Sequence, residues 1–364
     1  MKKLLILYIL LIGYINGSYP HPVFGENGMV VSTSRQASIA GIEILKMGGN
    51  AIDAACATGF VLAVTSSSNG NIGGGGFMVV HKENSKIFTL DYREIAPAAA
   101  HRDMFLDSNG EVIDNMSLRT RAASGVPGSV DGLLKAWKDH GSGNISRREL
   151  LASAIALAER GFELTHYEAK RFNNNKDLFF NNDAATKIFI RGDRKPWKAG
   201  DRFIQKDLAR TLKRIAREGR DGFYTGKTAD LIIAEMNRGI GLITHEDLLN
   251  YESKYREPMI GSFKGYEIIS MGLPSSGGTI LIEMLNMLEN FSLSELGWNS
   301  SEYIHLLTEV ERRAYADRAE HLGDADFWTP PLSMLTSKKY AIDRMKDFYA
   351  DKATSSTVIF AGDP

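Results

Sequence analysis

Cysteine is almost missing from this chain of 364 residues, which has Cys56 as its single thiol. One cysteine excludes an internal disulfide and leaves no Cys/His cluster for a structural zinc site. Net charge is nearly missing too, because 43 Lys and Arg residues are balanced by 44 Asp and Glu residues. Without a basic surplus, the chain is not expected to bind nucleic acid or an anionic membrane through its overall field.

Long hydrophobic runs are also scarce. The apolar run 4–15 is shorter than the roughly 20 residues that a membrane-spanning helix requires. It follows Lys2-Lys3 and precedes Gly17-Ser18, which is the order of a secretory signal peptide with a cleavage site. We therefore expect a signal peptide over residues 1–17, a mature region over residues 18–364, a periplasmic or secreted location and no stable membrane anchor. A buried N-terminal helix is the alternative.

Common catalytic signatures are absent as well. The 8 histidines include no HExxH pair, and no GxSxG elbow occurs, so the usual zinc-peptidase and serine-hydrolase patterns are excluded. The glycine run 73–76 lacks the order of a phosphate cradle, in which a strand enters and a helix leaves. It predicts a close backbone contact instead. Cys56 falls within an alanine-rich helix, which predicts a packed, unreactive thiol.

The elements that the sequence predicts are mostly helical, and several begin with an explicit cap. Capping-box spacing occurs at Ser146/Glu149 and Thr165/Glu168, and a further cap is expected at Thr244 with Asp247 or Glu246. We expect helices over 34–47, from residue 51 onward and over 279–288, strands over 77–80 and 87–91, and a hairpin of 256–262 with 266–271. The Asn-rich stretch 172–183 predicts an exposed loop, and no linker divides the chain into independent domains.

One charged residue is a candidate for ligand binding. Arg93 closes the second predicted strand in the segment LDYRE. A guanidinium held at a strand end can grip a carboxylate with two parallel hydrogen bonds. The alternative is an ordinary ion pair with Asp91 or Glu94, which is common for surface arginines.

Seven segments, in order along the chain, resemble the large subunit of the gamma-glutamyltranspeptidases, also called glutathione hydrolases. They read GGNAIDAACATGFVLAV, GNIGGGGFMVV, LDYREIAPAAAHRDMF, SGVPGSVDGLLKAW, GLITHEDLLNY, MGLPSSGGT and AYADRAEHLGDADF. The likeness runs from about residue 23 to the C-terminus. It implies an α+β fold, the αββα sandwich of the Ntn-hydrolases, of which this chain is the large-subunit part and is incomplete without the small subunit.

The resemblance also implies a mechanism. Family members are proenzymes that cut themselves into two subunits, and the new N-terminal threonine of the small subunit attacks the gamma-glutamyl amide of glutathione or a similar compound. The group then passes from the threonine to water or to an amino acid. No cofactor or metal is implied. Because no Thr-Thr-His occurs here, the nucleophile is expected after Pro364 and no catalytic residue is assigned within the chain, which alone is expected to be inactive.

Of the family's substrate-binding residues, Arg93 is the one that this chain matches, as the arginine that binds the alpha-carboxylate of the gamma-glutamyl group. The expected partners are therefore glutathione and other gamma-glutamyl compounds, and the chain's own small subunit in a heterodimer. Two other functions remain open: a truncated, noncatalytic remnant or binding protein, and a related acylase that acts on another amide.

Overall fold

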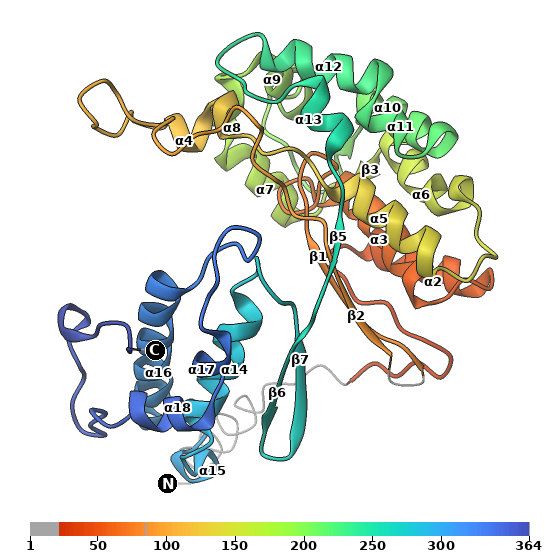
Figure 1. Ribbon diagram of the computed structural model, residues 1–364. Helices are drawn as coiled ribbons and strands as arrows, with labels where there is room; N and C mark the ends of the chain where they lie inside the picture. Colours follow the sequence, from red (N-terminus) through yellow and green to blue (C-terminus); the bar gives the residue numbers. More distant parts are fainter. Residues whose placement is uncertain (1–21, 84–85, 364) are drawn as a thin grey trace, which may run out of the picture.

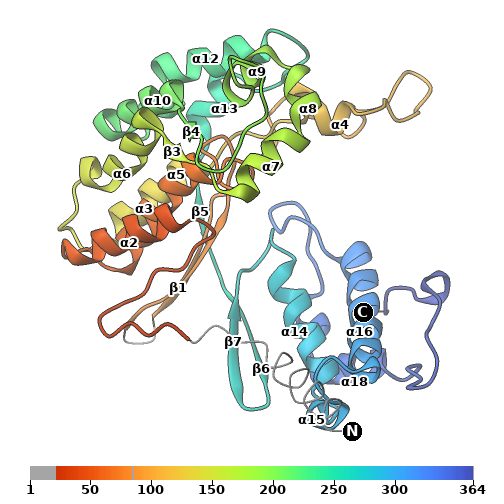
Figure 2. The ribbon, with the colours of Figure 1, turned by 180° about the vertical axis from the view of Figure 1, so that it is seen from behind.

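The computed structural model describes residues 22–83 and 86–363, so the predicted signal peptide lies outside the described part. Its helices and short sheets confirm the expected α+β class. Two hydrophobic cores form, one from residues between Ala37 and Tyr251 and the other from residues between Ile280 and Ala341. Figures 1 and 2 show the corresponding two parts, linked through extended chain at β5 and β6.

The first part is a layer of helices over a small sheet. Its helices are α2 (Arg35–Lys46), α3 (Ala51–Thr65), α4 (Met116–Arg119), α5 (Ser129–His140), α6 (Arg147–Arg160), α7 (His166–Asn174), α8 (Lys176–Phe180), α9 (Asp183–Phe189), α10 (Lys206–Glu218), α11 (Asp221–Tyr224), α12 (Gly226–Met236) and α13 (His245–Asn250), with the 3-10 turn η2 (Arg121–Ala123). Its strands are β1 (Phe77–His81), β2 (Ile87–Asp91), β3 (Phe162–Glu163), β4 (Arg202–Phe203) and β5 (Lys254–Arg256).

Helix α3 lies at the centre of this part (Figure 1), and most of its residues are buried. Asn50 caps it, and Asp53 completes a capping box by accepting from the Asn50 backbone N–H. Helix α2 crosses it closely: a Cβ on Gly41 would lie 2.5 Å from the Thr58 hydroxyl oxygen. The capping boxes predicted at α6, α7 and α13 are also present.

The main sheet has the order β1-β2-β5 and is antiparallel. Strands β1 and β2 form the predicted hairpin, with Phe77 opposite Asp91 and His81 opposite Ile87. Leu90 of β2 is fully buried in the first core, so the sheet is anchored against the helices. The second predicted hairpin is β6 (Met259–Phe263) with β7 (Tyr266–Ser270). However, residues 254–256 belong to β5, and the chain changes sheets around Pro258, which has no N–H to donate to a ladder.

The prediction of an exposed loop over the Asn-rich stretch 172–183 is wrong. The structure ends α7 there, forms α8 and begins α9. Phe172 is buried and packs its ring against four other aromatic side chains: Phe179, Phe189, Trp197 and Phe203. The asparagines help rather than oppose this packing, since Asn173 exchanges two hydrogen bonds of 2.9 Å with the Trp197 backbone.

The second part contains β6, β7 and the helices α14 (Gly277–Leu288), α15 (Leu293–Leu296), α16 (Ser301–His321), α17 (Leu332–Leu335) and α18 (Lys338–Arg344), followed by the 3-10 turn η3 (Ser356–Val358). Helix α14 begins two residues before its predicted start. None of the helices in the described part of the chain combines the length and apolar composition of a membrane span.

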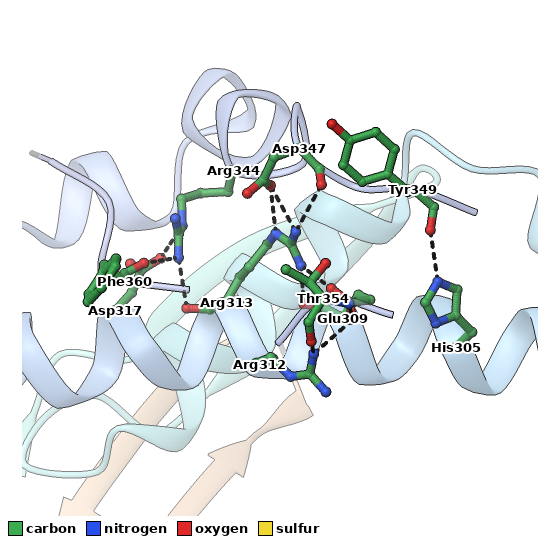
Figure 3. Close-up of polar contacts among 10 residues, drawn as sticks. All are labelled: His305, Glu309, Arg312, Arg313, Asp317, Arg344, Asp347, Tyr349, Thr354 and Phe360. Atoms are coloured by element: carbon green, nitrogen blue, oxygen red, sulfur yellow. Dashed lines mark hydrogen bonds and ion pairs between the residues drawn. The ribbon is translucent and has the colours of Figure 1, made fainter. Parts of the chain in front are cut away.

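Ion pairs with buried residues of α16 hold the C-terminal segment against this helix, as Figure 3 shows. Arg313 is buried between Glu309, at 2.7 Å, and Asp347, at 2.8 Å. One turn further along α16, the buried Asp317 accepts from Arg344 at 2.9 Å. Breaking such a contact would leave a buried charge without a partner, which is strongly destabilising. These contacts therefore hold Arg344 and Asp347 against α16.

Candidate functional site

Arg93 lies two residues beyond the end of β2, and its side chain is exposed. It lines a cavity of about 410 Å³ together with Gly73, residues 94–96 and residues 123–125. The centre of its guanidinium lies 5.9 Å from the centroid of the Phe77 ring, at the start of β1. A guanidinium on the wall of such a cavity is placed to receive an anion.

The ion pairs that were the alternative for Arg93 are not formed. Asp91 instead accepts from the Arg93 backbone N–H at 3.0 Å through Oδ1 and from Arg256 Nε at 3.2 Å through Oδ2. Arg256 in turn binds Asp326. Among residues 22–83 and 86–363, no carboxylate is ion-paired with the Arg93 guanidinium. Asp91 is therefore already occupied, Glu94 lines the cavity without forming an ion pair with Arg93 among the described residues, and the guanidinium keeps its hydrogen-bond donors.

The glycine run begins at Gly73, which lines the cavity, and it makes the predicted close backbone contact. A Cβ on Gly75 would lie 2.5 Å from the Tyr92 carbonyl oxygen. The Gly74 carbonyl accepts from the backbone N–H groups of Gly128, at 2.8 Å, and Ser129, at 3.0 Å. The segments GNIGGGGFMVV, LDYRE and SGVPGSVDG thus meet here through their backbones, and the glycines are structural.

The cavity offers a guanidinium that can bind an anion, which is a different requirement from acyl transfer. Acyl transfer needs a nucleophile with a base in hydrogen-bond reach. In the described part of the chain, no base is hydrogen-bonded to the hydroxyl of Ser124, the hydroxyl residue that lines the cavity. Nor do the described residues contain a cluster of acidic, His or Cys side chains that could hold a metal ion.

Cys56 is not part of this site. Its thiol is fully buried within α3. Burial, and secondarily the nearby Asp53 carboxylate, raises the pKa of the Cys56 thiol, so the nucleophilic thiolate is not formed at neutral pH. The prediction that Cys56 is packed in the interior is confirmed.

Sequence reasoning missed Tyr251, which reaches the site from the end of α13. Its hydroxyl donates to the Arg93 carbonyl oxygen at 2.9 Å, across 158 positions in the sequence. The signal that could have pointed to it is its place as the final residue of the segment GLITHEDLLNY. Tyr251 does not line the Arg93 cavity; it lines a larger one, of about 750 Å³, together with residues of α5, α6, α10, α11 and α13.

Comparisons with known proteins agree on one family. The family described as Gamma-glutamyltranspeptidase matches residues 37–362. A glutathione hydrolase proenzyme from Pseudomonas aeruginosa is 45% identical over 322 residues, which cover 88% of this chain and 56% of that relative. An Acylase ACY 1 proenzyme from Pseudomonas sp. SE83 is 36% identical over 347 residues, 94% of this chain and 62% of that relative.

The solved structures show the same likeness in space. The crystal structure of Helicobacter pylori gamma-glutamyltranspeptidase matches with a TM-score of 0.91 and 42% identity, over 94% of this chain and 97% of that chain. The expected kinship with Ntn-hydrolases is confirmed by such neighbours. This chain spans less than two thirds of the length of the curated relatives that it matches.

Proposed function

The chain belongs to the gamma-glutamyltranspeptidase family, and from this premise we propose that it is the large-subunit part of a glutathione hydrolase. The enzyme cleaves the gamma-glutamyl amide of glutathione and transfers the gamma-glutamyl group to water or to an amino acid. The role of this chain is to bind the substrate. Its partner is the small subunit released from the same proenzyme.

One observation supports this role most strongly: the Arg93 guanidinium lines a cavity and has no ion pair within the described residues. A gamma-glutamyl group carries an alpha-carboxylate, whose two oxygens match the planar fork of an arginine. Binding at Arg93 fixes one end of the substrate and directs the gamma-carbonyl toward the place where the nucleophile arrives. Because the substrate is already held in place, less entropy is lost on reaching the transition state.

The nucleophile in this proposal is the N-terminal threonine of the small subunit, expected after Pro364. Its hydroxyl oxygen bonds to the gamma-carbonyl carbon, and its own alpha-amine accepts the hydroxyl proton. The amide C–N bond then breaks, and the leaving amine takes that proton. Water or the amine of an amino acid attacks the resulting ester and regenerates the threonine. Without this residue, the 364-residue chain alone is expected to be inactive.

A related acylase is the second candidate, and it is favoured by the 36% identity to an Acylase ACY 1 proenzyme. The two functions differ in what Arg93 meets. A gamma-glutamyl substrate brings an alpha-carboxylate to Arg93, whereas an amide that lacks this group gains nothing from the guanidinium. Rates on paired amides with and without the alpha-carboxylate therefore separate the two candidates.

The test of the proposed function is Arg93→Lys in the enzyme assembled from this chain and a family small subunit. Lysine keeps the charge but loses the planar fork, so kcat/KM for a gamma-glutamyl anilide should fall about 10- to 100-fold. Arg102→Lys is the matched control, because the Arg102 side chain is 96% exposed and does not line the cavity. Unchanged kinetics in Arg93→Lys would remove the assigned role.

Export to the periplasm or the medium is part of the proposal. It rests on the Lys2-Lys3 start and the short apolar run 4–15. When the protein is made in a secreting bacterial host, mass spectrometry should find its N-terminus near Ser18. An intact Met1 on the mature cytoplasmic protein would contradict export.

A further inference from the structure

The backbone of Arg93 is held on both sides, although the residue lies beyond the strand. Its N–H donates to Asp91 Oδ1 at 3.0 Å, and its carbonyl accepts from the Tyr251 hydroxyl at 2.9 Å. The β1–β2 ladder ends just before it, with the paired hydrogen bonds between Gly76 and Tyr92. Backbone pairing resumes at Ile95, which is bridged to Val126. The Tyr251 hydroxyl therefore supplies a contact where regular pairing is interrupted.

Tyr251 is itself held rigidly. Its side chain is buried, and its ring stacks on that of Tyr224 with centroids 5.7 Å apart and planes 7° apart. Its backbone carbonyl accepts from Arg220, whose guanidinium also binds the buried Asp131 at 2.8 Å. A Cβ on Gly128 would lie only 2.1 Å from the Tyr251 hydroxyl oxygen, so that hydroxyl has little room to move.

The Tyr251 hydroxyl also keeps its proton, so it can act as a hydrogen-bond donor. Burial, followed by the nearby carboxylates of which Asp131 contributes most, raises the pKa of the Tyr251 hydroxyl well above its usual range. It therefore stays protonated at neutral pH. It is thus able to donate to the Arg93 carbonyl at that pH.

We propose that Tyr251 is a positioning residue for substrate binding, which sets the position of Arg93 so that its guanidinium meets the alpha-carboxylate of a gamma-glutamyl substrate in a two-point contact. This inference rests on the proposed function of Arg93. Tyr251 does not touch the substrate. It acts through one hydrogen bond to the backbone, and its effect depends on a carboxylate being present on the substrate.

The experiment is Tyr251→Phe in the enzyme assembled with a small subunit, assayed with two anilides. The gamma-glutamyl anilide has the alpha-carboxylate, and the 4-aminobutyryl anilide is the same molecule without it. For the first, KM should rise about five- to tenfold, the size of one lost hydrogen bond, with kcat within about twofold. For the second, wild type and variant should give the same kcat/KM.

Tyr255→Phe is the matched control, because it removes a tyrosine hydroxyl from β5 that binds Asp139 at 2.9 Å. It should leave KM for both anilides unchanged. If Tyr251→Phe does not fold, 4-fluorophenylalanine at position 251 fills the space of the hydroxyl without donating, and the same rise in KM is expected. Thermal midpoints establish that each protein compared is folded.

The outcomes separate the two proposals. If Arg93→Lys raises KM while Tyr251→Phe does not, the inference on Tyr251 is overturned and the proposed function stands. If Tyr251→Phe lowers kcat/KM equally for both anilides, the residue is merely structural and the inference is also overturned. If Arg93→Lys changes nothing, the proposed function fails, and the inference fails with it.

Discussion

The arginines of this chain differ in whether a carboxylate of the protein already forms an ion pair with them. Arg256, Arg313 and Arg344 each have a carboxylate partner within about 3 Å. Arg93 has none among the described residues, yet its backbone is fixed by two hydrogen bonds. A guanidinium whose backbone is fixed and whose donors have no internal partner keeps those donors for a ligand, which is the basis of the role proposed for Arg93.

Cys56 provides a prediction about reactivity. Because the thiol is fully buried and its pKa is raised, a thiol reagent such as a disulfide dye at about pH 8 should label the native protein only slowly, over hours rather than minutes. The denatured protein should label at once. Cys56→Ser should leave activity unchanged and cost on the order of 1 kcal/mol of unfolding free energy. Full labelling of native protein within minutes would contradict the burial.

Glu283 provides a prediction about pH. Its carboxyl is fully buried on α14, and burial first, then the neighbouring Asp317, raises its pKa above the usual 4.5. The folded state then holds a proton that the unfolded chain has released. Stability from this group is complete below about pH 4.5 and is lost as pH rises toward the folded-state pKa, by up to about 1.4 kcal/mol per pH unit.

Glu283→Gln should therefore flatten the dependence of unfolding free energy on pH between about pH 6 and about pH 9, as measured by urea titration. Glu289→Gln is the control. Glu289 is the C-cap residue of the same helix, and its ion pair with Lys338 lowers its pKa, so this change should shift the curve without altering its slope in that range. Parallel curves for wild type and Glu283→Gln would contradict the prediction.

Elements were predictable from the sequence where the signal is local. Asn50 with Asp53, and Ser146 with Glu149, fix helix starts through side chains three positions apart. The end of β5 at Arg256 and the helices around Phe172 were not predictable, because a sheet change and an aromatic cluster depend on partners far along the chain. For the same reason Arg93 was found from its strand end, whereas Tyr251, 158 positions away, was not.

The glycine run gives a prediction at the scale of the loop. A Cβ on Gly75 would lie 2.5 Å from the Tyr92 carbonyl oxygen and 2.7 Å from the Arg93 Cα, both backbone atoms that cannot give way. Gly75→Ala should lower the unfolding free energy by about 1–3 kcal/mol. A Cβ on Gly73 would have its nearest contact at 3.4 Å, with Asn71 Oδ1, so Gly73→Ala should change the unfolding free energy little. Equal thermal midpoints for the two variants would contradict this account of the loop.

At the scale of the whole molecule, the two cores are tied together through β5. Lys254 and Arg256 both bind Asp326, which follows α16, and Arg256 also reaches Asp91 beside the Arg93 cavity. The second part of the chain is thus connected by charge to the strand end that positions Arg93. This connection explains why the carboxylate of Asp91 is not available to the Arg93 guanidinium.

The central claim is that this chain binds the gamma-glutamyl group and that the nucleophile comes from another subunit. Its most direct test measures glutamate released from glutathione by purified residues 18–364, alone and after coexpression with a family small subunit that begins at threonine. We predict release at the uncatalysed background from the chain alone and well above it from the assembled pair. Release above background from the chain alone, or none from a correctly assembled pair, would contradict the claim.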